Sequence, residues 1–326
     1  MSRVVQKRFR FVHEDKPGIK WAQFYTESAE SYRKWFLKEG EFNRPSFHQC
    51  KKALQTYMPE LLPLWETMIQ LCNGGDLEAR LLSLYCPTPY LSGCSQAAWL
   101  RYNPILVRNY DYDPALCEGR ILRSRWHNTD VIASTDCLWG VLDGMNEHGL
   151  AVSLSFGGKE ESGEGFGIPI ILRYILEFCR TTTEAVAVLR RIPTHMSYNV
   201  TVLDAYSDVA TVELCPTTTP NVSRKPLAVN QQGEFELTNY TLFSRSYERK
   251  QILIDTLYDP LTTIESFINA FEYAPLFASN YDNGFGTLYT AIYNPQLRAM
   301  EYRWPYHTRV YQSFQWFEST DFWVTY

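Results

Sequence analysis

The chain has 326 residues, 45% of them hydrophobic and 15% aromatic, so it can bury a large core as one or two globular domains. Its 31 Lys and Arg against 36 Asp and Glu give a formal charge of −5, which argues against a nucleic-acid partner. Apolar runs are too short to cross a bilayer and the N-terminus lacks a signal-peptide core, so we expect no membrane span and a cytoplasmic location.

Helical periodicity marks the first 90 or so residues. A run capped by Ser28 carries Tyr32, Trp35 and Phe36 on one face, and a second run starts at Pro45. Two further helices are expected over residues 61–71 and 77–84. These patterns predict a mostly helical leader, which we assign to residues 1–93.

Short strands dominate the rest of the chain. They are expected at residues 96–102, 105–110, 120–126, 131–134, 138–145, 150–156, 200–204, 210–214, 288–293, 299–303 and 308–312. Helices are expected at residues 168–180, 183–191, 247–257 and 263–271. Strands and helix pairs in this order predict an α+β fold for residues 94–326, a four-layer αββα sandwich of two antiparallel sheets flanked by helices.

Eight cysteines are scattered along the chain without a CxxC pair, and no histidine stands at metal-ligand spacing. The pattern argues against a disulfide framework and a zinc site, and we expect neither a metal nor a cofactor. Most buried cysteines act as small apolar residues, and seven of these eight fit that interpretation. Cys94 is the exception, because of its neighbours.

Five segments in order resemble the choloylglycine hydrolase superfamily, which includes bile-salt and penicillin V hydrolases and the penicillin acyltransferase-like family. They are Gly93-Cys94-Ser95-Gln96, Arg108-Asn109-Tyr110-Asp111, residues 143–152, Leu227-Ala228-Val229-Asn230, and residues 244–249. A leader of this length ending in Gly-Cys resembles the acyltransferase-like branch. The resemblance implies the N-terminal nucleophile hydrolase fold.

The resemblance also implies that the chain cuts itself at Gly93-Cys94. Gly93 lacks a Cβ and so permits close approach of the thiol to the carbonyl before it. The resulting shift of the acyl group from nitrogen to sulfur gives a thioester that water can hydrolyse. Cys94 then keeps a free α-amino group, whose reference pKa of roughly 7.7–8.0 suits a general base for its own sulfur.

Four further residues receive roles from the same resemblance. Arg108 would favour the thiolate, and Asp111 would accept a hydrogen bond from the α-amine. Asn230 would donate to the oxyanion of the tetrahedral intermediate, with a second donor at Ser155, where a backbone N–H could serve.

The late arginine of the family pattern has two candidates in this sequence. Arg245 and Arg249 both fit the spacing within residues 244–249, and we prefer Arg249 because it lies where a helix starts. Residues 146–149, by contrast, are interpreted as a hairpin turn without a catalytic role.

These residues predict a self-processing cysteine amidohydrolase that cleaves linear, non-peptide amide C–N bonds through a Cys94 thioester. It would act as an acyltransferase where an amine accepts the acyl group. The alternative is a non-catalytic binding or assembly protein that retains the fold. A papain-like Cys-His couple has no support in the sequence. The expected partner is a small-molecule N-acyl amide, and a homo-oligomer stays open.

Overall fold

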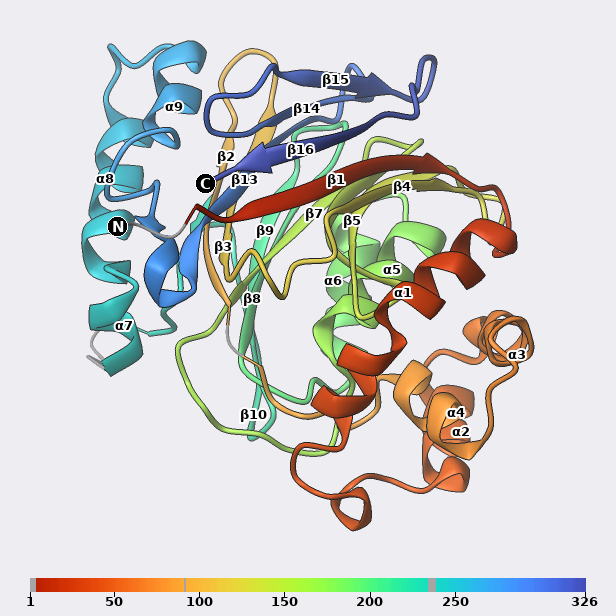
Figure 1. Cartoon of the computed structure of the whole chain (residues 1–326). Helices are drawn as coiled ribbons and strands as arrows, with labels where there is room; N and C mark the ends of the chain where they lie inside the picture. Colours follow the sequence, from red (N-terminus) through yellow and green to blue (C-terminus); the bar gives the residue numbers. More distant parts are fainter. Residues whose placement is uncertain (1–3, 91, 234–238) are drawn as a thin grey trace.

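Two β-sheets form the centre of the computed structural model of the chain, which describes residues 4–90, 92–233 and 239–326 (Figure 1). The larger sheet has the strand order β10-β9-β8-β7-β6-β5-β4-β1-β16 and the smaller β11-β2-β3-β13-β14-β15, with β12 beside β13.

The strands of the larger sheet are β1 (Gln6–His13), β4 (Arg120–Ser124), β5 (Val131–Asp136), β6 (Gly140–Asn146), β7 (Ala151–Phe156), β8 (Tyr198–Leu203), β9 (Val209–Cys215), β10 (Thr218–Ser223) and β16 (Asp321–Thr325). Those of the smaller sheet are β2 (Gly93–Trp99), β3 (Ile105–Tyr112), β11 (Leu227–Ala228), β12 (Ser279–Asn280), β13 (Phe285–Asn294), β14 (Ala299–Arg303) and β15 (Val310–Ser313).

The two sheets pack face to face through β2 and β3 on one side and β7 and β8 on the other. Gln96 of β2 donates to the carbonyl of Asn199 in β8 over 3.2 Å, and Arg108 of β3 donates to the carbonyl of Leu154 in β7 over 3.0 Å. Polar side chains therefore tie the sheets together at a point close to Cys94.

Helices cover both outer faces. α5 (Ile168–Phe178) and α6 (Thr182–Arg191) pack on the larger sheet, and α8 (Ser246–Tyr258) packs on β2 and β11 of the smaller one, followed by α9 (Ile264–Ala270) (Figure 1). A short helix, α7 (Asn239–Phe243), precedes α8. The predicted four-layer αββα sandwich is confirmed.

The N-terminal segment differs from its prediction in two respects. Its helices are α1 (Ile19–Phe36), α2 (Phe47–Tyr57), α3 (Leu62–Leu71) and α4 (Asp76–Ser83), but β1 precedes them as a strand. Moreover, α1 begins after Gly18, so Ser28 lies inside the helix and does not cap it.

β1 also changes the larger sheet. It pairs in parallel with β4 and antiparallel with β16, so this sheet is mixed and not purely antiparallel as expected. The parallel pair forms because a strand from the leader enters between two strands of the remaining chain.

The leader and the rest of the chain share one hydrophobic core. The indole of Trp21 in α1 donates to the carbonyl of Leu138 over 3.1 Å, and that of Trp139 donates back to Leu82 in α4 over 2.9 Å. Both indoles are fully buried. The leader is thus packed as part of the same folded body. Within the described ranges, no helix combines the length and apolarity needed to cross a bilayer.

Candidate active site

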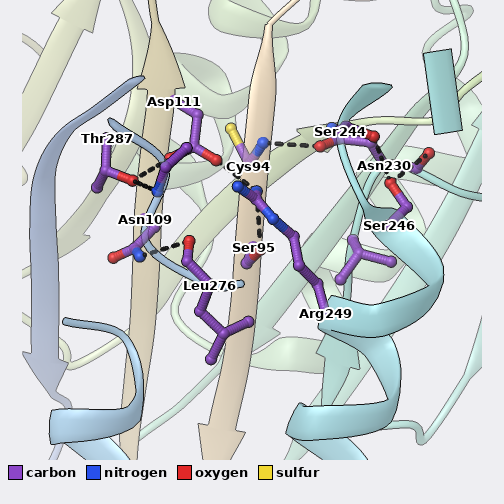
Figure 2. Close-up of polar contacts among 12 residues, drawn as sticks. Cys94, Ser95, Asn109, Asp111, Asn230, Ser244, Ser246, Arg249, Leu276 and Thr287 are labelled. Carbon is purple, nitrogen blue, oxygen red and sulfur yellow. Dashed lines mark hydrogen bonds and ion pairs between the residues drawn. The ribbon is translucent and has the colours of Figure 1, made fainter. Parts of the chain in front are cut away.

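Cys94 is the second residue of β2, and this position decides which side chains surround it. In the antiparallel pairing of β2 with β3, Cys94 lies opposite Tyr110 and Gly93 opposite Asp111. Facing residues in such a pair project to the same side, while neighbours along a strand alternate. The Cys94 side chain therefore points between the sheets, and Ser95 and Asp111 point toward α8 (Figure 2).

Arg108 contacts the Cys94 sulfur and is itself held on three sides. Its Nη2 donates to Sγ of Cys94 over 2.9 Å, and its Nε donates to the carbonyl of Leu154 over 3.0 Å. Its Nη1 forms an ion pair with Asp143. Cys94, Arg108 and Asp143 are all fully buried. The guanidinium is thus fixed against the thiol, as the sequence analysis expected of Arg108.

The pKa of the Cys94 thiol is raised above its ordinary value, and burial is the main cause. The charge of Arg108 and its hydrogen bond lower this pKa, whereas the Asp111 carboxylate raises it. In the uncut chain, however, the cost of burying a thiolate outweighs the effect of Arg108.

On the other face of β2, Asp111 holds a polar cluster together (Figure 2). Its carboxylate is ion-paired with Arg249 of α8 and accepts a hydrogen bond of 2.6 Å from Oγ1 of Thr287. Nη1 of Arg249 also donates to Oγ of Ser95 over 3.3 Å. Asp111 is fully buried and Arg249 is 2% exposed. This cluster lies beside the start of β2, on the side of the strand that faces α8.

The two arginine candidates are separated clearly. Arg249 belongs to the buried cluster, whereas Arg245 lies at the surface in an ion pair with Glu248. Arg245 is the residue just before α8, with φ 54°, and its side chain is 52% exposed. The structure thus brings Arg249 to Asp111 and Ser95 on the helix side of β2 and leaves Arg245 outside this cluster.

Asn230 spans the Gly93-Cys94 peptide. Its Oδ1 accepts a 2.9 Å hydrogen bond from the backbone N–H of Cys94, the atom that would become the α-amine. Its Nδ2 donates to the carbonyls of Ser92 over 3.3 Å and Phe156 over 3.1 Å. In the uncut chain the Cys94 nitrogen is therefore bonded to Asn230, while Asp111 is bonded to Arg249 and Thr287.

Ser155 is buried near this group without touching Cys94 through its hydroxyl. Its Oγ donates to the carbonyl of Val229 over 3.1 Å, next to Asn230, and accepts from Nδ2 of Asn199 over 3.3 Å. The hydroxyl proton is therefore used to hold the Asn230 segment in place. Ser155 could serve an oxyanion only through its backbone.

Asp143 is a functional candidate that the sequence analysis did not single out. Besides Arg108, its carboxylate accepts from the hydroxyls of Tyr289 over 2.8 Å, of Ser134 over 3.1 Å, and of Tyr293. In the sequence, the one feature that marks Asp143 is that it is a lone carboxylate within an otherwise apolar strand. Asn146, three residues on, closes the β6–β7 turn with its side chain, as the hairpin interpretation predicted.

Tyr240 and Thr287 were also missed, because nothing in their local sequence marks them. The Tyr240 hydroxyl is buried without a hydrogen-bond partner among the described residues. Burial raises the pKa of Tyr240, and the charges of Cys94 and Asp111 raise it further, so the ring lies near the site. Among the residues described here, no group of three or more His, Cys, Asp and Glu side chains is arranged to hold a metal ion.

Two facing sheets between helical layers, with Cys94 at the head of an inner strand, define the N-terminal nucleophile hydrolase fold. A family model for acyl-coenzyme A:6-aminopenicillanic acid acyl-transferase matches residues 99–308. The chain belongs to this family, and it is an enzyme of the hydrolase or acyltransferase type. The match contains Arg108, Asp111, Asn230 and Arg249 but begins after Cys94.

Solved structures with a similar fold share little sequence with the chain. Penicillin V acylase from Agrobacterium tumefaciens has 14% identity and a TM-score of 0.46, covering 68% of this chain and 86% of that one. A mutant conjugated bile acid hydrolase from Clostridium perfringens has 12% identity and a TM-score of 0.46, covering 70% and 96%. The Caenorhabditis elegans ortholog of N-acylethanolamine-hydrolyzing acid amidase has 19% identity and a TM-score of 0.45, covering 63% of this chain and 93% of that one. Compared by sequence, no curated protein matches the chain significantly.

Proposed function

We propose that the chain cuts itself between Gly93 and Cys94 and then uses Cys94 as the nucleophile of a linear-amide hydrolase. The observation that carries this proposal is Asn230, whose side chain contacts the Cys94 nitrogen on one side of the peptide and the Ser92 carbonyl on the other. A side chain in that position can orient the Cys94 nitrogen and donate to an oxyanion. The division into a leader, 1–93, and an enzyme domain, 94–326, follows from the same proposal.

The first step is the cut itself. The Cys94 sulfur attacks the Gly93 carbonyl carbon, the C–S bond forms, and the C–N bond breaks as the nitrogen takes the thiol proton. Water then hydrolyses the thioester, which leaves a carboxylate on Gly93 and a free thiol and α-amine on Cys94. Departure of the leader end would release the Nδ2–H of Asn230 that now binds Ser92.

Catalysis would repeat this chemistry on an N-acyl amide. The α-amine takes the thiol proton, the sulfur attacks the amide carbon, and the amine product leaves with a proton. Arg108, fixed by Asp143 and Leu154, stabilises the thiolate, and Asn230 donates to the oxyanion. Water or a second amine then takes the acyl group, so hydrolysis and acyl transfer share one intermediate. Family membership favours this enzyme over a non-catalytic binding protein.

Intact mass measurement of the purified protein tests the cut. We expect two chains, residues 1–93 and 94–326, and a single uncut chain for Cys94→Ala. Cys179→Ala, another buried cysteine, is the matched control and should be cut normally. Amidase activity on an N-acyl p-nitroanilide should follow the cut. Activity that survives Cys94→Ala would refute the assignment of the nucleophile, and an uncut but active chain would refute self-processing.

A further inference from the structure

The aromatic ring of Phe285 lies against Gly93, the residue before Cys94. A Cβ added to Gly93 would overlap the Cε2 and Cζ atoms of this ring and would lie 3.0 Å from the Cβ of Asp111. Gly93 sits in the regular strand β2 and is not among the described residues with positive φ, so its backbone would suit other residues. Glycine is needed here because Phe285 occupies the space of a side chain.

Phe285 is held in this place from two directions. It is the first residue of β13, whose next residue, Gly286, pairs with Tyr112 of β3, and it also pairs with Asn280 of β12. On its outer side the ring of Phe243 packs edge-on against it, with centroids 4.8 Å apart. Phe285 is half-buried and Phe243 is 50% exposed. Backbone pairing and ring packing together keep the Phe285 ring over Gly93.

The lack of room for a side chain at Gly93 bears on substrates, because the proposed cut and the reaction with a substrate form a thioester on the same sulfur. The thioester formed during self-cleavage carries the Gly93 acyl group on the Cys94 sulfur. A substrate amide that acylates Cys94 gives the same kind of thioester on the same atom. The carbon next to the carbonyl, the α-carbon, is Gly93 Cα in the first case and the substrate's own α-carbon in the second.

We propose that Phe285 makes the enzyme selective for acyl groups whose α-carbon is an unbranched methylene. The inference rests on the proposed function of Cys94 and adds the class of acyl group that it accepts. Substrates are then amides of straight-chain or arylmethyl acids. Acids with an α-substituent in the position of an L-residue's Cβ are excluded, because that substituent meets the Phe285 ring.

Three p-nitroanilides measure this selectivity: octanoyl and the two enantiomers of 2-methyloctanoyl. One extra methyl group in a packed site corresponds to roughly a 10- to 100-fold loss. We therefore expect kcat/KM to fall by about that factor for the enantiomer whose methyl matches an L-residue's Cβ. Phe285→Ala should recover most of the loss, and Phe243→Ala, which removes the ring that supports Phe285 from outside, should recover part of it.

The self-cleavage reaction gives a second readout that needs no external substrate. Gly93→Ala should leave the chain uncut, and Gly93→Ala combined with Phe285→Ala should restore the cut, as judged by intact mass, with melting temperatures recorded to check folding. The inference is overturned if the wild type accepts both branched enantiomers as fast as octanoyl, or if Gly93→Ala is cut as quickly as the wild type. Absence of any cut in the wild-type chain would instead refute the proposed function on which the inference rests.

Discussion

Replacing Arg108 with methionine removes the cation that contacts the Cys94 sulfur and keeps an apolar side chain of similar length. A hydrogen bond from a charged group contributes about 1.5–3 kcal/mol, and one pKa unit corresponds to about 1.4 kcal/mol. Burial already raises the pKa of the thiol. We therefore expect this pKa to rise further, and the thiolate fraction at neutral pH to fall about 10- to 100-fold.

The single change would also leave the Asp143 carboxylate buried without its counter-charge. Breaking a buried ion pair in this way costs about 3–5 kcal/mol, which could hide the effect on the thiol. The informative variant is therefore Arg108→Met with Asp143→Asn, which keeps the pocket neutral. Asp143→Asn alone should act in the opposite direction, because the Arg108 charge is then unopposed and lowers the pKa of Cys94.

Alkylation of Cys94 by iodoacetamide between pH 5 and 10 provides the measurement. Mass spectrometry of the Cys94 peptide follows the rate in the cut protein, with the peptide of buried Cys179 as an internal reference. The midpoint should move up in the double variant and down in Asp143→Asn. An unchanged midpoint in the double variant would refute the electrostatic role of Arg108. An upward shift in Asp143→Asn would show that packing, and not charge, governs the thiol.

Three further predictions follow from the described contacts. Arg249→Met should abolish the cut and lower the free energy of unfolding by about 3–5 kcal/mol, because it leaves the buried Asp111 carboxylate without its counter-charge. The exposed Arg245→Met should change neither the cut nor the stability. Equal effects of the two variants in intact mass and denaturant melts would contradict the placement of Arg249, and not Arg245, in the site. Burial, and next the charge of Glu118, raise the pKa of Asp136 to about 7, so the stability of the folded chain should fall as pH rises from about 4 to about 7. Asp136→Asn should flatten this slope in thermal melts. A wild-type slope in that variant would exclude Asp136 as its cause. After cleavage, fragments 1–93 and 94–326 should co-elute in native size exclusion because they share one core; separate peaks without denaturant would refute this.

The sequence carried most of the four-layer fold because its helices and strands have clear local periods. The carbonyls of Leu154 and Asn199 join the sheets: Leu154 lies within the predicted strand 150–156, and Asn199 lies one residue before the predicted strand 200–204. β1 was missed because the strands that pair with it lie far along the chain, at residues 120–123 and 321–325. Pairing at such separations leaves no mark in the local pattern.

The site divides in the same way. Cys94, Arg108, Asp111 and Asn230 were identified in ordered motifs, and the structure gathers them around one peptide. The choice between Arg245 and Arg249 depended on which of the two side chains faces the sheet at the start of the helix. The spacing of the two residues, four positions apart, does not decide this. Phe285 could not be foreseen, because its contact with Gly93 joins strands almost two hundred residues apart.

The position of β1 also bears on the order of events during synthesis. β1 leaves the ribosome well before β16, residues 321–325, which covers one of its edges. Arg249 and Thr287, which hold Asp111, are likewise translated well after Cys94. An uncovered strand edge invites pairing with other chains, and contacts this distant form slowly. The nascent chain thus reaches the arrangement around Gly93-Cys94 only after Arg249 and Thr287 have been translated, so the proposed cut would come after these parts of the smaller sheet's surroundings have been made.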